Sequence, residues 1–177
     1  MGDRLSNLVK RNNAKIDLRK IPNSLEAIEA LERQMQEAGE EAPTQVNHYV
    51  SRDVYVRELV IPKGVLVIGR VHKYDHVSIM LEGEMLMWTS DKGAFKIKAP
   101  FISTTKAGSK RVGFALSDTR FVTAHGTPNV PDWDPCLPDE ELKALFTTRT
   151  MIEYNLFATK AEQLQLAIPQ QPLIEMW

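Results

Sequence analysis

Three histidines, His72, His76 and His125, are the residues with the clearest capacity for chemistry, and all lie within residues 64–127. Imidazole nitrogen is a common ligand of zinc and of other divalent transition metals. On one continuous strand, His72 and His76 would be about 13 Å apart, too far to share an ion. The residues between them, Lys73–Asp75, have the composition of a turn. A hairpin there would bring the two imidazoles face to face.

A second turn brings His125 to the same place. If the chain forms a hairpin at Ser117-Asp118, His125 lies opposite Lys110 and beside Arg111. Three imidazoles at one end of a β-sandwich would form an open site for a divalent ion, with iron, manganese, nickel and zinc as candidates. The alternative is that each is an ordinary strand histidine, half-exposed or hydrogen-bonded. The sequence leaves both readings open.

Three further side chains, Arg70, Tyr74 and Arg111, are candidates for lining a pocket beside the histidines. A guanidinium binds carboxylate or phosphate in a bidentate manner, so a small anionic molecule is the expected ligand. The alternative for Arg111 is a place, with Lys110, on a charged sheet edge, and the alternative for Tyr74 is an ordinary turn tyrosine. The sequence contains no glycine-rich phosphate loop, nucleophile elbow or zinc-finger pattern, so no catalytic residue is named and enzymatic activity stays open.

Short apolar runs separated by compact turns predict a mainly β fold around these residues. Such strands, with a turn about every 8 to 12 residues, are typical of an antiparallel sandwich or barrel. A stripe of Met80, Met85, Met87 and Trp88 is assigned to its core. We expect strands over 54–61, 65–72, 76–81, 84–89, 95–98, 110–116 and 119–125.

Helices are expected on both sides of the β region. Ser24 is a good N-cap for an amphipathic helix over 24–38, and further helices are expected from Asp139 and from Met151. The predicted organisation is an N-terminal arm and helix (1–46), a β-barrel (47–127), and a loop with short helices and a C-terminal strap on the barrel or a neighbouring subunit (128–177).

The overall composition is that of a cytosolic globular protein. The chain has 177 residues, of which 43% are apolar and 25% charged, which suits one domain. Its net charge of −1 gives no electrostatic reason to bind nucleic acid or a membrane surface, and no apolar run is long enough to cross a membrane. Cys136 is the single cysteine, which excludes an internal disulfide and fits a reducing compartment.

The segment HKYDHVSIMLEGE resembles the first motif of the cupin superfamily, the RmlC-like jelly rolls. His72 matches one metal-binding histidine of that motif, and His76 stands about where its metal-binding glutamate stands. Arg70 and Arg111 take the places of two other histidines of the family, one from each motif. The resemblance covers roughly residues 50–127 and implies a double-stranded β-helix, an antiparallel jelly roll that often forms dimers. Two such replacements would ordinarily mean a lost metal, but His125 would supply another ligand.

Two functions follow from these observations. The first is a metal-binding cupin, with His72, His76 and His125 at the barrel mouth, that acts on a small anionic molecule. The second is a non-catalytic structural or host-interaction protein that uses the jelly roll as a scaffold, because the same pattern also resembles uncharacterised cupin-like proteins encoded by bacteriophages. For either function we expect a homo-oligomer, a dimer or higher, and a protein partner for the N-terminal arm. The expected location is the cytoplasm, and for a phage protein the host cytoplasm or the virion.

Overall fold

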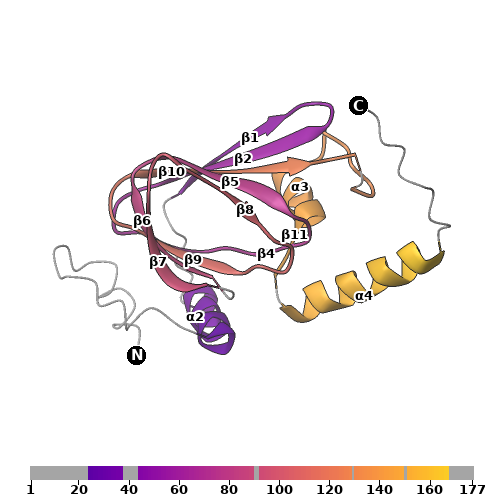
Figure 1. Cartoon of the computed structure of the whole chain (residues 1–177), viewed down its shortest axis with the longest axis horizontal. Coiled ribbons are helices and arrows are strands. Elements are labelled where there is room, and N and C mark those ends of the chain that lie inside the picture. Colours follow the sequence, from indigo (N-terminus) through magenta and orange to yellow (C-terminus); the bar gives the residue numbers. More distant parts are fainter. Residues whose placement is uncertain (1–23, 38–43, 90–91, 129, 150, 168–177) are drawn as a thin grey trace.

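Two antiparallel sheets face each other and enclose the core of the computed structural model, which describes residues 24–37, 44–89, 92–128, 130–149 and 151–167 (Figure 1). One sheet has the order β1 (Gln45–Val50), β2 (Val54–Ile61), β10 (Thr119–Gly126), β5 (His76–Glu82) and β8 (Phe101–Thr105). The other has the order β3 (Leu66–Ile68), β9 (Arg111–Ala115), β6 (Glu84–Thr89) and β7 (Gly93–Lys98). Two short strands, β4 (Val71–His72) and β11 (Thr147–Thr148), pair with each other at one end.

The strand order is that of a jelly roll. Between β2 and β10 the chain crosses from one sheet to the other at every connection except the β6–β7 hairpin. Two interleaved four-stranded sheets, β2-β10-β5-β8 and β3-β9-β6-β7, result from this path. The predicted mainly β, antiparallel double-stranded β-helix is therefore confirmed.

The strands predicted from the sequence were incomplete, although the predicted fold class was correct. The strand expected over 65–72 divides into β3 and β4, with Gly69 and Arg70 between them. Strands β1 and β8 were not predicted, and β1 begins before the expected barrel boundary at residue 47. Both are edge strands of their sheet with polar and exposed residues, so they lack the long apolar runs that mark a buried strand.

The predicted hairpin of residues 110–116 with 119–125 is wrong. β10 pairs with β2 and β5, where Thr123 lies opposite Arg57 and Ser78, whereas β9 pairs with β3 and β6. The turn at Ser117-Asp118 carries the chain between the sheets. It packs against the β5–β6 turn, where Gly83 has a φ of 92° and a Cβ would lie 2.3 Å from the Asp118 carbonyl oxygen.

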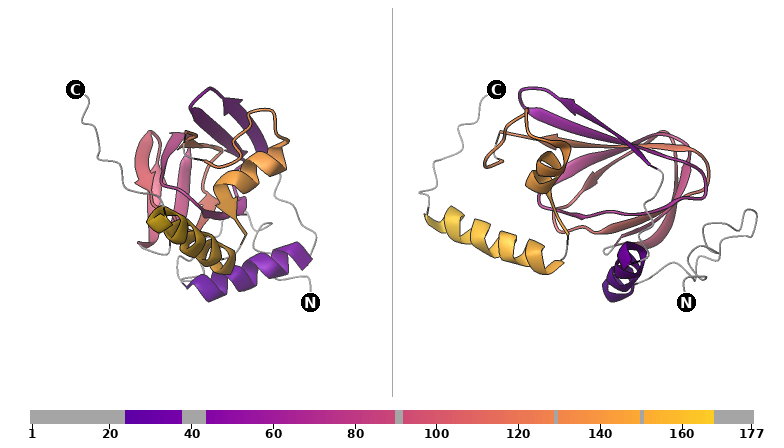
Figure 2. Two further views of the ribbon diagram at one scale, coloured as in Figure 1. Left: turned by 90° about the vertical axis from the view of Figure 1, so that its right-hand side faces the viewer. Right: turned by 180° about the vertical axis from the view of Figure 1, so that it is seen from behind.

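The predicted helices are present. α2 (Leu25–Glu37) begins after Ser24, whose Oγ accepts a hydrogen bond from the Ala27 N–H at 3.2 Å. It lies across the outer side of the smaller sheet, where Ile28 is fully buried against Trp88 and Val112 (Figures 1 and 2). The N-terminal arm, the predicted end of this helix and the C-terminal strap lie outside the described residues.

α3 (Asp139–Phe146) and α4 (Met151–Ala167) follow the barrel. α3 closes one end, where its Leu142 and Phe146 pack with Tyr55 in a second apolar cluster. The first part of α4 packs against the barrel, and the helix then extends beyond it (Figure 2). Within the described part of the chain, no helix has both the length and the apolar character needed to span a membrane.

A buried ion pair attaches α2 to the barrel. Lys110 is fully buried, and its Nζ donates to Glu32 Oε2 at 2.5 Å and to the Arg149 carbonyl oxygen at 3.3 Å. Removing one partner of a buried pair leaves the other charge uncompensated in a medium of low polarity. The pair therefore links α2, the residue that precedes β9 and the segment before α4.

We expect Glu32→Gln to lower the free energy of unfolding by about 2–3 kcal/mol, measured by urea denaturation. The expected loss is below the maximum for a buried pair because the Glu32 side chain is 21% exposed. Glu37→Gln, at an exposed position of the same helix, is the matched control and should change stability little. The double variant Glu32→Gln/Lys110→Met should recover most of the loss. Equal stability of the two single variants would contradict the role of the pair.

Candidate metal centre and pocket

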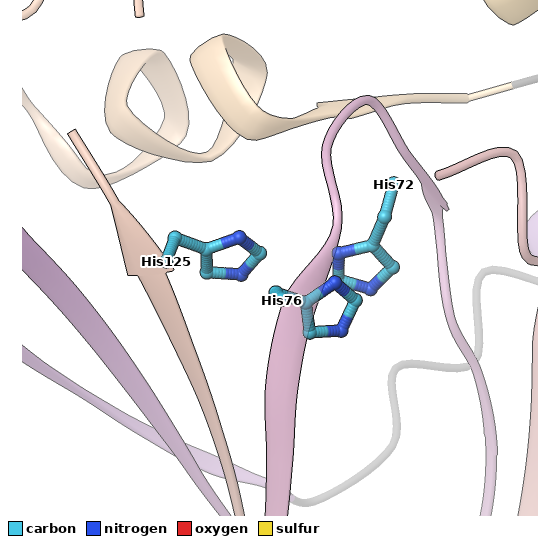
Figure 3. A group of neighbouring side chains, drawn as sticks. All are labelled: His72, His76 and His125. Carbon is cyan, nitrogen blue, oxygen red and sulfur yellow. The ribbon is translucent and has the colours of Figure 1, made fainter. Parts of the chain in front are cut away.

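His72, His76 and His125 converge from β4, β5 and β10 (Figure 3). Each side chain offers a nitrogen, and these ligand atoms all lie within 4.8 Å of one another. The ring centroids are 4.0 Å apart for His72 and His76, and 4.6 Å apart for His76 and His125. All three residues are buried. The structure thus brings together the three histidines that the sequence singled out.

The turn between His72 and His76 is present, but the two residues are not paired across one hairpin. β4 pairs with β11 and β5 pairs with β10 and β8, so the imidazoles meet inside the barrel. Asp75 holds the turn by accepting hydrogen bonds from Lys106 Nζ at 2.7 Å and from the Ala107 N–H at 2.9 Å. The predicted turn is correct, and the predicted pairing across one sheet is not.

His125 reaches the site by a route that the sequence did not suggest. It lies opposite Tyr55 on β2, and the two rings stack with centroids 6.0 Å apart. The Tyr55 hydroxyl lies 2.7 Å from Nδ1 of His48, a residue for which no role was predicted. His48, on β1, thus lies on the other side of Tyr55 from His125 and outside the cluster.

The surroundings favour the neutral form of all three imidazoles. Burial, together with the Arg111 charge, lowers the pKa of His76 to about 4. Burial, with the neighbouring His76 and Arg111, lowers the pKa of His125 to about 3, and burial and His76 hold that of His72 well below its ordinary value. A neutral imidazole is the form that binds a metal. His76 Nδ1 lies 3.3 Å from the Tyr74 carbonyl oxygen, and donation there leaves the Nε2 lone pair free to face inward.

Arg111 is the cation nearest to the histidines. Its Nη2 lies 3.3 Å from His72 Nε2 and 3.1 Å from His76 Nε2. Its Nη1 donates to Ser78 Oγ at 2.7 Å and to Thr105 Oγ1 at 3.2 Å. Burial lowers the pKa of Arg111 to about 10, so the guanidinium stays charged at neutral pH. Arg111 therefore competes with a metal ion for two of the lone pairs that the ion would use.

The donor set fits a divalent ion in number, type and spacing. Three neutral imidazoles with room for further ligands are a known arrangement for zinc and related ions. Nδ1 of His72 and Nδ1 of His125 are buried and have no hydrogen-bond partner among the described residues. Buried polar atoms normally have partners, so the described residues alone do not meet the hydrogen-bonding capacity of these two rings. Arg111 is the group that an ion at Nε2 has to displace.

A cavity of about 230 Å³ adjoins the histidines inside the barrel. Arg70 and Arg111 line it, as the sequence suggested, whereas Tyr74 is not among the lining residues. The Tyr74 ring packs edge-on against Phe146 of α3 and Phe157 of α4. Further lining residues that sequence reasoning missed include Glu32, Tyr55, Arg57, Lys143 and Phe146.

One of the missed residues had a signal in the sequence. Arg57 lies on β2 between Tyr55 and Leu59, and alternation places these three residues on the same face of the strand. An arginine on an otherwise apolar inward face indicates a site. Lys143 and Phe146 come from α3 and carried no such signal, because only the packing of α3 over the barrel brings them to the cavity.

No family model matches this chain, and no curated protein does. Solved structures of similar shape include a cupin-family protein with a double-stranded β-helix fold from Methanocaldococcus jannaschii, at 17% identity and a TM-score of 0.42 over 49% of this chain and 83% of that one. An RmlC-like cupin from Shewanella frigidimarina matches at 11% identity and a TM-score of 0.43, over 50% and 80% of the two chains. These values support no inference about activity, ligand or partner. The strand order of this chain by itself supports the jelly-roll assignment.

Proposed function

We propose that this protein binds one divalent metal ion through His72, His76 and His125, next to a pocket for a small anionic molecule. The observation that carries the proposal is the meeting of three buried, neutral imidazoles from separate strands, with ligand atoms within 4.8 Å of one another. A bound divalent ion would supply Lewis acidity at the histidine side of the cavity. The chain's own residues would bind and orient the anion, through Arg70 and Arg111, and keep water out, through Phe146.

The experiment is elemental analysis of protein purified without a histidine tag, before and after incubation with iron, manganese, nickel or zinc salts. We expect about one ion per chain in the wild type and close to none in His72→Ala and in His125→Ala. His48→Ala is the matched control, because His48 lies behind Tyr55, outside the cluster, and its loss should leave the metal content unchanged. A wild-type protein that takes up no metal from any of these salts would refute the proposal.

A second candidate function is favoured by the position of Arg111. Its guanidinium already bonds to Nε2 of both His72 and His76, so an arginine could hold the cluster together in a non-catalytic scaffold. The phage-type structural or host-interaction role is of this kind. In that case the wild type would contain no metal, and Arg111→Met would lower its thermal stability without any metal being added or removed.

A further inference from the structure

Three buried side-chain atoms lack a hydrogen-bond partner in the described part of the chain, and all belong to residues that line the same cavity. They are Nδ1 of His72, Nδ1 of His125 and Nε of Arg57. The two histidine nitrogens belong to rings of the proposed metal centre. Nε of Arg57 does not, because a guanidinium donates hydrogen bonds and ligates no metal. A buried donor without an acceptor is costly, so this atom indicates an acceptor that enters the cavity from outside.

The charges around the cavity also indicate an anion. Four cations line it, namely Arg57, Arg70, Arg111 and Lys143. Arg70 and Lys143 share the carboxylate of Glu140. Within the described residues, neither Arg57 nor Arg111 forms an ion pair, and the one carboxylate among the lining residues, Glu32, is bonded to Lys110. A partly buried cation without a counter-ion destabilises the protein unless a ligand supplies the charge.

The position of Arg57 defines the kind of anion. On β2, Arg57 follows Tyr55, near the histidines and α3, and precedes Leu59 and Ile61, which line the cavity together with Phe121. The wall therefore changes along one strand from cationic to apolar. A volume of about 230 Å³ is below the range of roughly 300–1,000 Å³ that drug-sized ligands occupy. The ligand must be compact, with a charged head and an apolar body.

We propose that Arg57 anchors the head group of a small amphipathic oxyanion, a carboxylate or phosphate monoester joined to a compact apolar body. The Arg57 fork would donate to two oxygens of the head group, with Arg70 as the second cation. Leu59, Ile61 and Phe121 would contact the body. This inference rests on the proposed function for the location of the ligand, but it requires no metal ion.

The test is a titration of protein whose methionine methyl groups carry ¹³C, because Met85 and Met87 line the cavity and report on its occupation. The probes are benzoate, phenyl phosphate and the neutral benzamide, each added to metal-free and to metal-loaded protein. We expect benzoate or phenyl phosphate to shift the Met85 and Met87 resonances with millimolar or tighter affinity in both preparations. Benzamide should bind at least about tenfold more weakly, because it lacks the charge.

Variants assign the effect to Arg57. Arg57→Gln should weaken oxyanion binding at least about tenfold, and Arg57→Lys should restore part of it, because a lysine keeps the charge but not the fork. Arg52→Gln removes an arginine whose side chain is 94% exposed and should change nothing. If Arg57→Gln does not fold, the comparison of benzoate with benzamide on the wild type still decides the class of ligand.

Three results of the metal-free titrations would overturn the proposal, and a fourth comes from the comparison with metal-loaded protein. They are the absence of binding by either oxyanion, equal binding of benzoate and benzamide, and wild-type affinity in Arg57→Gln. Oxyanion binding that requires the metal-loaded protein would also overturn it, because the ion and not Arg57 would then hold the head group. A protein that takes up no metal but binds oxyanions through Arg57 would refute the proposed metal centre and support this inference.

Discussion

Replacing Arg111 with methionine is expected to tighten divalent metal binding at least tenfold. The guanidinium lies 3.3 Å and 3.1 Å from the two Nε2 atoms that an ion would bind, so the arginine both occupies the lone pairs and repels a second cation. Two unit charges 4 Å apart repel by about 4 kcal/mol at an effective dielectric constant near 20, of which relaxation removes a part. Competition titration with a chromogenic chelator measures the change in affinity.

We expect the rest of the site to tolerate this replacement. Ser78 Oγ and Thr105 Oγ1, the other partners of Arg111, are 2.8 Å apart and keep their mutual hydrogen bond. Arg70→Met is the matched control, since Arg70 lines the same cavity but bonds to Glu140, and it should change metal affinity much less. A weaker metal affinity in Arg111→Met would mean that the arginine orients the imidazoles for the ion, contrary to our expectation.

The metal-free protein should lose several kcal/mol of stability as the pH falls from 6.5 toward 4. The folded-state pKa values are about 4 for His76 and about 3 for His125, and that of His72 is also far below 6.5. Between these values and 6.5, the unfolded chain binds protons that the folded chain does not, so acid favours unfolding, and the loss begins as the pH drops through 6.5. Three such groups give a slope of about 3–4 kcal/mol per pH unit.

Urea denaturation at a series of pH values measures this slope. Carboxylates with lowered pKa values, such as Glu84 and Asp75, lose their contribution only near and below their ordinary values of 4.5 and 3.8, so the upper part of the window reports the histidines. His125→Gln should lower the number of protons taken up on unfolding by about one, which reduces the slope by up to about 1.4 kcal/mol per pH unit. His48→Gln should reduce it less, because His48 is less buried than the cluster. A stability that is constant from pH 6.5 to 5 would mean that the folded cluster accepts protons.

Much of this protein was predictable from local patterns. Ser24 caps α2 as expected, and the alternation and turn residues located most of the strands. The grouping of His72 with His76 needed only the turn at Lys73–Asp75. These features depend on residues close in sequence, where backbone preferences and side-chain alternation act directly.

Two predictions involving the last strand show where local reasoning stops. His125 does reach the cluster, but through β2 and β5 and not through the hairpin with β9 that the sequence suggested. A turn such as Ser117-Asp118 has the same composition whether it joins paired strands or carries the chain between sheets. The partner of each strand is decided by the packing of the whole barrel.

The sequence by itself determined the mainly β class, the helices and the three histidines of the candidate site. The tertiary structure alone decided that Arg111 bonds to two of those histidines, that Arg57 lines the same cavity without an acceptor for its Nε, and that Lys110 pairs with Glu32. The reason is physical. Each of these contacts joins residues more than 30 positions apart or depends on a cavity lined by both sheets and α3, and the energy of burying a charge depends on what surrounds it after folding.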